Sequence, residues 1–120
     1  MFDYYQRMRI TTLKALADET RLAIVELLAD GERCVCDLAT ALGASDALVS
    51  HHIKRLREAG LVRTRRVGVW LHCSLEPQAL SDVARTLDTL SARAQAAAES
   101  DVVCCSPSTR SRRNGREGTS

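Results

Sequence analysis

Aromatic residues are scarce in this chain of 120 residues, which has one Phe, one Trp and two Tyr. A core must therefore be built mainly from Leu, Val, Ile and Ala, and the length allows one domain of modest size. No apolar run approaches the roughly 20 residues of a membrane-spanning helix. The first residues, MFDYYQRMRI, lack the apolar centre of a signal peptide. We therefore expect a cytoplasmic protein with no membrane partner.

Positive charge is concentrated in two segments, although the net charge is only +2. Residues 51–66 carry six basic residues against Glu58 alone, and residues 106–120 carry four arginines against Glu117. The rest of the chain is net acidic. A basic patch on an acidic body is typical of a nucleic-acid binder. A solvated helix and hairpin would explain the same charges, so charge alone leaves both interpretations open.

The hydrophobic pattern predicts four helices, two strands and a last helix. On the first helix, Ile10 and Leu13 belong to the expected apolar stripe. Thr20 and Ser45 are the expected N-caps of the second and fourth helices, and Gly31 is the expected left-handed end of the second. The predicted helices cover residues 4–17, 21–30, 33–42, 46–59 and 78–99, and the strands lie within residues 61–75.

The fourth helix is predicted to have one apolar and one basic face. At 100° per residue, Val49, Ile53 and Leu56 fall together and must face the core. With the preceding helix and the hairpin, this pattern predicts a mainly α fold, a winged helix-turn-helix that binds DNA in the major groove. The expected DNA contacts are Ser50, His51, Lys54 and Arg55 on the helix, and Arg65 and Arg66 before the hairpin tip.

The last helix carries more apolar surface than one small domain needs. Its stripe runs from Leu80 to Ala94, and together with the first helix it predicts a homodimer. We expect residues 1–100 to form the DNA-binding and dimerisation domain. Residues 101–120 hold two cysteines and a basic segment without apolar residues from Ser106 onward, which predicts a disordered tail.

Four segments, taken together, resemble the ArsR/SmtB family of metal-sensing bacterial repressors. They are LKALADETRLAIVELL, CVCDLATALG, LVSHHIKRLREAGLV and RRVGVWLHCSL, and the resemblance covers roughly residues 10–80. It implies a homodimeric repressor that binds double-stranded operator DNA when free and releases it on binding a toxic ion. It also implies that the chain is not an enzyme.

Five cysteines in a reducing compartment favour metal or redox chemistry over structural disulfides. Cys34 and Cys36 fall at a helix start, where the dipole lowers a thiol pKa. Thiolates select soft ions such as Zn(II), Cd(II), Pb(II), As(III) or Sb(III), and the last two prefer three sulfurs. Because residues two apart in a helix point about 200° away from each other, we expect binding to both to unwind the first turn.

The identity of the third ligand is open. Arsenic sensors of the family typically carry a cysteine three residues after the second, where this chain has Ala39. We expect three thiolates drawn from Cys34, Cys36, Cys104 and Cys105; a self-contained Cys104–Cys105 pair with one other ligand is the competing arrangement. Members of the family that sense zinc, cobalt or nickel place histidine and carboxylate ligands on the last helix. Residues 78–99 contain no histidine, so the resemblance argues against a nitrogen and oxygen zinc site. The vicinal pair favours As(III) or Sb(III) over Cd(II), Pb(II) or Zn(II) as inducer.

Two other functions use the same cysteines. One is a repressor that senses thiol oxidation on the same fold. The other is an enzyme with a cysteine nucleophile, which is disfavoured because no outward His–carboxylate pair accompanies any cysteine. Cys73, on the second predicted strand, is expected to be a half-buried core residue rather than a ligand.

Overall fold

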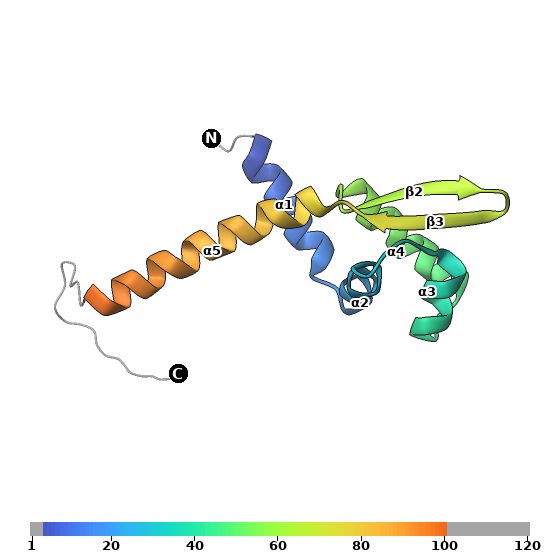
Figure 1. Cartoon of the computed structure of the whole chain (residues 1–120), viewed down its shortest axis with the longest axis horizontal. Helices are drawn as coiled ribbons and strands as arrows, with labels where there is room; N and C mark the ends of the chain where they lie inside the picture. Colours follow the sequence, from blue (N-terminus) through green and yellow to red (C-terminus); the bar gives the residue numbers. More distant parts are fainter. Residues whose placement is uncertain (1–3, 101–120) are drawn as a thin grey trace. The chain divides into compact units, whose positions relative to one another are not determined.

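Five helices and three strands form the part of the chain that the computed structural model describes, residues 4–100 (Figure 1). The chain divides into two compact units at Thr86 and Leu87, so α5 starts in the first and continues in the second. The order of elements confirms the predicted winged helix-turn-helix. The elements are α1 Tyr4–Leu16, α2 Glu19–Leu28, β1 Arg33–Cys34, α3 Val35–Leu42, α4 Asp46–Glu58, β2 Val62–Val67, β3 Trp70–Leu75 and α5 Pro77–Ser100.

The caps of the helices explain where they begin and end. Ser45 is extended, and its hydroxyl accepts a hydrogen bond from the Leu48 N–H, as predicted for the N-cap of α4. The prediction that Thr20 caps α2 is wrong, because Asp18 is the extended residue and its carboxylate accepts from the Arg21 N–H at 3.0 Å. Gly31 also differs from prediction: α2 ends at Leu28, and Gly31 has a φ of 139°, outside the left-handed helical region.

Gly43 separates α3 from α4 in the left-handed conformation, with φ 65° and ψ 33°. Its N–H donates to the carbonyls of Ala39 and Thr40 near the end of α3. A residue with a Cβ would adopt this left-handed conformation only at a steric cost. The short turn that follows sets α3 and α4 against each other as the two helices of the helix-turn-helix motif.

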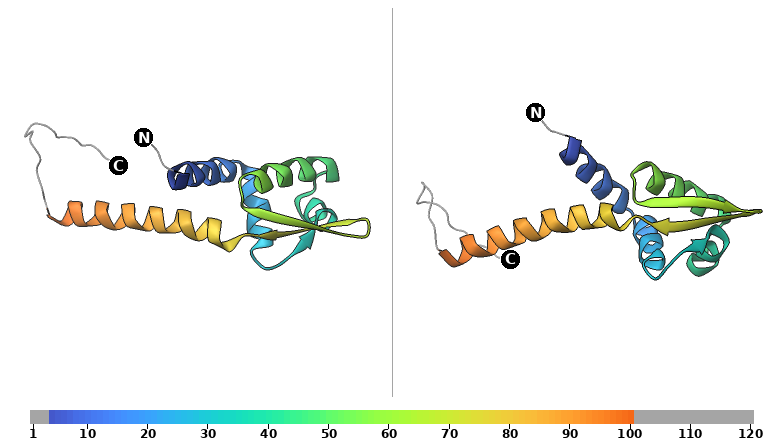
Figure 2. Two further views of the ribbon diagram at one scale, coloured as in Figure 1. Left: turned by 90° about the horizontal axis from the view of Figure 1, so that it is seen from above. Right: turned by 45° about the horizontal axis from the view of Figure 1, so that its top comes forward.

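The sheet has the strand order β1-β3-β2, and both pairings are antiparallel. The hairpin of β2 and β3 is the predicted wing, and its tip projects from the body of the first unit (Figure 2). The two-residue strand β1 was not predicted. It pairs Arg33 with Cys73 and Cys34 with His72, and so joins the start of α3 to the wing.

The core lies between α2, α3, α4 and the sheet. Burial of a Leu, Ile or Val side chain stabilises the fold by about 1.5–3 kcal/mol, so this cluster accounts for much of the hydrophobic stabilisation. The predicted core face of α4 is confirmed. The largest fully buried side chains are Ile24, Leu38, Leu56, Leu61, Val49 and Cys73.

Apolar side chains of two helices are left exposed. On α1, Thr12 and Ala15 are buried, whereas Ile10 and Leu13 of the predicted stripe are 45 % and 41 % exposed. On α5, Val83 is buried, but Leu87 and Leu90 are each 50 % exposed. No helix of residues 4–100 combines the length and the apolar character that crossing a membrane requires.

Candidate thiol site and nucleic-acid interface

Cys34 occupies two structural positions at once. It is the last residue of β1 and the N-cap of α3, with φ −83° and ψ 162°. Its Sγ accepts a hydrogen bond from the Asp37 N–H at 3.4 Å, so the sulfur takes the place that a serine oxygen takes in most N-caps. A sulfur held there faces the positive end of the helix dipole.

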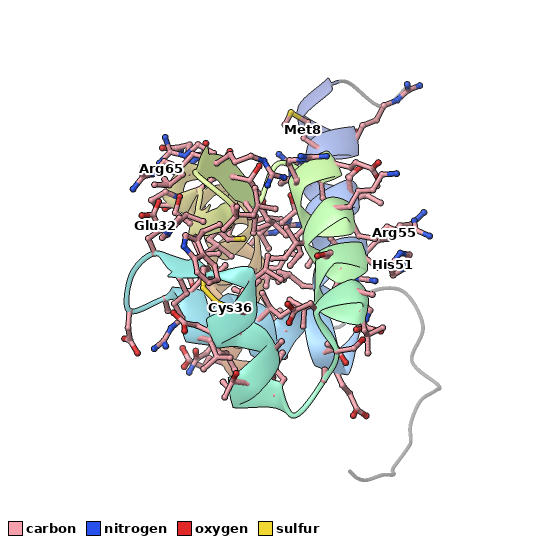
Figure 3. The ribbon with its side chains drawn as sticks, turned by 90° about the vertical axis from the view of Figure 1, so that its right-hand side faces the viewer. Met8, Glu32, Cys36, His51, Arg55 and Arg65 are labelled. Atoms are coloured by element: carbon pink, nitrogen blue, oxygen red, sulfur yellow. A yellow bond between two sulfur atoms is a disulfide. The ribbon has the colours of Figure 1, made fainter. Side chains whose placement is uncertain are left out.

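Cys36 lies in the first turn of α3 and brings its sulfur to that of Cys34. The two form a disulfide, with their Cα atoms 5.4 Å apart (Figure 3). Cys34 is buried and Cys36 is half-buried. Within residues 4–100, the possible metal-binding groups found together are these two sulfurs and an exposed Asp37 carboxylate oxygen, all within 4.8 Å of one another.

This geometry corrects the expectation that an ion held by both cysteines must unwind the first turn of the helix. That expectation assumed helical backbone at Cys34. Because Cys34 is extended, its side chain points back over the turn towards Cys36 while α3 stays intact. This backbone therefore allows both sulfurs to approach one ion without loss of helix.

The described residues supply two sulfurs of the three that As(III) or Sb(III) prefers. Asp37 offers a hard carboxylate oxygen, which suits such ions less well than a thiolate. Ala39 points into the core and is 4 % exposed, so α3 has no third ligand in this place. Cys104 and Cys105, the predicted source of the third thiolate, lie outside the described residues.

Cys73 is a core residue, as predicted, although it is fully rather than half buried. Its side chain is inaccessible to solvent, and burial raises the pKa of its thiol to about 11. The nearby Glu32 carboxylate is the second, smaller cause of this raised pKa. The thiol is therefore protonated at neutral pH, which makes it a poor ligand and a poor nucleophile.

The outer face of α4 carries the residues predicted to contact DNA. Ser50, His51, Lys54 and Arg55 are all exposed, on the side opposite the buried face. Figure 3 shows His51 and Arg55 projecting away from the body of the unit. Within residues 4–100, neither Lys54 nor Arg55 has a carboxylate partner in an ion pair. Both cations are therefore free to meet phosphates or bases.

His52, which follows His51 on α4, faces the interior of the unit instead of solvent. Its side chain is 13 % exposed, and its Nδ1 lies 4.0 Å from the Asp18 carboxylate at the start of α2. This nitrogen is buried and has no hydrogen-bond partner within the described residues. His52 therefore packs α4 against α2 and supports the helix from the side opposite its exposed basic face.

The three wing arginines differ in their surroundings, which sequence reasoning did not anticipate. Arg63 pairs with Glu76 at 2.9 Å. Arg65 donates two hydrogen bonds to Glu32, from Nε at 3.0 Å and from Nη2 at 2.8 Å. This bond lowers the pKa of the Glu32 carboxyl and raises that of the Arg65 guanidinium. Among residues 4–100, Arg66 has no carboxylate partner, so it is the wing arginine most available to DNA.

The wing tip is apolar. Val69 is 82 % exposed and Trp70, the sole tryptophan, is 53 % exposed. Gly68 adopts φ 62° there, which allows the tight turn between the strands. A projecting, basic-flanked hairpin beside an exposed basic helix defines the class of the protein: a winged helix-turn-helix DNA-binding protein.

Comparison with known proteins assigns the family. Residues 18–64 match the model of the bacterial regulatory protein arsR family. The chain is 49 % identical over 80 residues to the arsenical resistance operon repressor of Escherichia coli K12, covering 66 % of this chain and 68 % of that protein. The chain belongs to the arsR family and is a transcriptional regulator, not an enzyme.

Two solved structures are also similar. The antimony-specific transcriptional repressor AntR superposes with a TM-score of 0.56 at 32 % identity, over 72 % of this chain and 79 % of that one. A homodimeric winged helix-turn-helix DNA-binding domain from Mycobacterium bovis, described as a possible ArsR-family transcriptional regulator, superposes with a TM-score of 0.58 at 36 % identity. It covers 75 % of this chain and 79 % of that one.

Proposed function

We propose that this protein is a metalloid-responsive repressor, which binds operator DNA as a homodimer and is released when As(III) or Sb(III) binds cysteine thiolates. The observation that carries the proposal is the meeting of the Cys34 and Cys36 sulfurs at the start of α3. This helix immediately precedes α4, which carries the exposed basic face. The similarity to an arsenical resistance repressor and to an antimony-specific repressor supports the same inducer class.

The inducer site is proposed to hold three thiolates. Cys34 and Cys36 supply two, and Cys104 or Cys105 supplies the third, from the same or the partner chain. Both sulfurs of the Cys34–Cys36 pair must be reduced before they bind an ion, so the site belongs to the cytoplasm, where thiols are kept reduced. Cd(II), Pb(II) and Zn(II) are the competing ions, because they also accept thiolate ligands.

A thiol-oxidation sensor is the second candidate, and the Cys34–Cys36 disulfide is the observation that favours it. Release of a labelled operator fragment separates the two. The reduced protein should release DNA on titration with arsenite or antimonite, and with much less effect from cadmium. Release by peroxide alone, with no response to any of these ions under reducing conditions, would replace the first function by the second.

We propose a homodimer because apolar side chains of α1 and α5 remain exposed. Met8, Ile10 and Leu13 on α1, and Leu87 and Leu90 on α5, are each 41–50 % exposed. Large exposed apolar patches are typical of protein interfaces. We expect sedimentation equilibrium at micromolar concentration to give twice the chain mass of 13.2 kDa. A mass of one chain would contradict the dimer.

The wing is proposed to contact the DNA backbone or minor groove through Arg66. Replacing Arg66 by alanine should weaken binding to specific and unrelated DNA alike. It should also reduce the slope of log affinity against log salt by about 1 for each protomer, since one fewer phosphate is neutralised. Fluorescence anisotropy at several salt concentrations measures both quantities. An unchanged slope would count against the wing as a contact surface.

A further inference from the structure

Glu32 joins the segment that carries the thiols to the wing. It lies two residues before Cys34, and its carboxylate holds the Arg65 guanidinium of β2 through both oxygens, at 2.8 and 3.0 Å. The same carboxylate lies 3.8 Å from Nδ1 of His72 on β3. Figure 3 shows Glu32 and Arg65 together on the side of the unit away from His51 and Arg55.

The backbone makes the same connection. Cys34 of β1 lies opposite His72 of β3, and His72 lies opposite Arg65 of β2. One row of the sheet therefore runs from a thiol to the arginine that Glu32 holds. β1 has only two residues, and one of them, Cys34, is also the N-cap of α3. Because a single residue separates Cys34 from Glu32, we expect a displacement of Cys34 to move Glu32 as well.

We propose that Glu32 is a positioning residue through which inducer binding at Cys34 and Cys36 is transmitted to the wing. The inference rests on the function proposed above. In the DNA-binding form, the Glu32–Arg65 pair fixes the wing relative to β1. An ion bound to the Cys34 sulfur displaces that sulfur from the Asp37 N–H, shifts β1 and breaks the two-fold contact with Arg65.

The geometry of the pair makes it suitable for this role. Two parallel N–H···O bonds require the guanidinium and carboxylate planes to stay aligned, so a small shift of β1 weakens both bonds together. Such a contact has two discrete arrangements, formed and broken, as a coupled element requires. The wing orientation, and with it the operator affinity, then depends on whether the thiols hold an ion.

The test compares Glu32→Gln with a matched control, Glu76→Gln. Glu76 pairs with Arg63 on the same strand, and the side-chain exposures are nearly equal: 66 % and 35 % for Arg63 and Glu76, against 63 % and 32 % for Arg65 and Glu32. Glu76 follows β3 and is not on the thiol segment. Each variant removes one negative charge from a wing ion pair, and only Glu32→Gln breaks the connection to Cys34.

The measured quantity is the operator Kd with saturating arsenite or antimonite divided by the operator Kd without it, under reducing conditions. We expect Glu32→Gln to lower this ratio at least tenfold, with the inducer affinity of the DNA-free protein changed less than about threefold. We expect Glu76→Gln to keep the wild-type ratio. In a double-mutant cycle, Arg65→Gln added to Glu32→Gln should lower the ratio no further, because both remove one contact.

Each other result counts against a specific claim. A wild-type ratio in Glu32→Gln, or equal losses in Glu32→Gln and Glu76→Gln, would overturn the coupling role and leave the repressor function standing. A wild-type protein that neither ion releases would overturn both. Thermal unfolding of the two variants checks that the fold is retained. If the Tm falls in Glu32→Gln alone, an unchanged inducer affinity shows that the thiol site is intact and that the lower ratio reflects lost coupling.

Discussion

Replacing Cys36 by serine should leave operator binding unchanged and abolish release by As(III) or Sb(III). Cys36 is half-buried and contributes a sulfur to the pair at the start of α3, but it does not cap the helix. Its loss therefore removes a proposed ligand and should leave the fold intact. Because changes outside the ligand shell alone weaken metal sites about 10–100-fold, loss of a ligand should raise the inducer concentration for half release by at least about 100-fold.

Two further variants make this result specific. Cys34→Ser should behave in the same way and keep α3 stable, because serine is a good N-cap and its hydroxyl can accept the Asp37 N–H. Cys73→Ala is the control, since its thiol is buried and protonated. If the Cys36→Ser variant still releases operator DNA at the wild-type inducer concentration, the site lies elsewhere, with Cys104 and Cys105 as the remaining candidates.

Replacing Lys54 and Arg55 together by glutamine should weaken operator binding at least about 100-fold. Each good side-chain contact to a base contributes roughly 1–3 kcal/mol, and a dimer would lose two such pairs of side chains. Both are exposed on α4 beside His51, and their replacement leaves the buried Val49, Ile53 and Leu56 untouched. Electrophoretic mobility shift with an operator fragment measures the loss.

A control for this pair is Arg85→Gln on α5, which removes one positive charge where the double variant removes two. Arg85 is exposed and pairs with Asp82 three residues earlier, on a helix that is not expected to touch DNA. It removes a positive charge without touching the proposed interface and should leave affinity within about twofold. A double variant on α4 that binds as tightly as wild type would remove α4 from the interface.

The elements of this fold were predictable from the sequence because their signals are local. Val49, Ile53 and Leu56 recur at helical spacing, and Ser45 and Gly43 are typical of an N-cap and a left-handed stop. The exposed basic face of α4 follows from the same periodicity. The wing follows from β-branched residues on both sides of Gly68. Each of these features depends on residues within about one turn or one hairpin of one another.

The winged helix-turn-helix, the exposed basic positions of α4 and the two cysteines at the start of α3 all follow from local sequence patterns. The placement of these two side chains depends instead on contacts between segments far apart in the chain. Cys34 is extended because β1 pairs with β3, and this pairing, 38 residues along the chain at His72, brings its sulfur to Cys36 without unwinding α3. The Glu32–Arg65 contact spans 33 residues and depends on the register of the sheet, which no local pattern encodes.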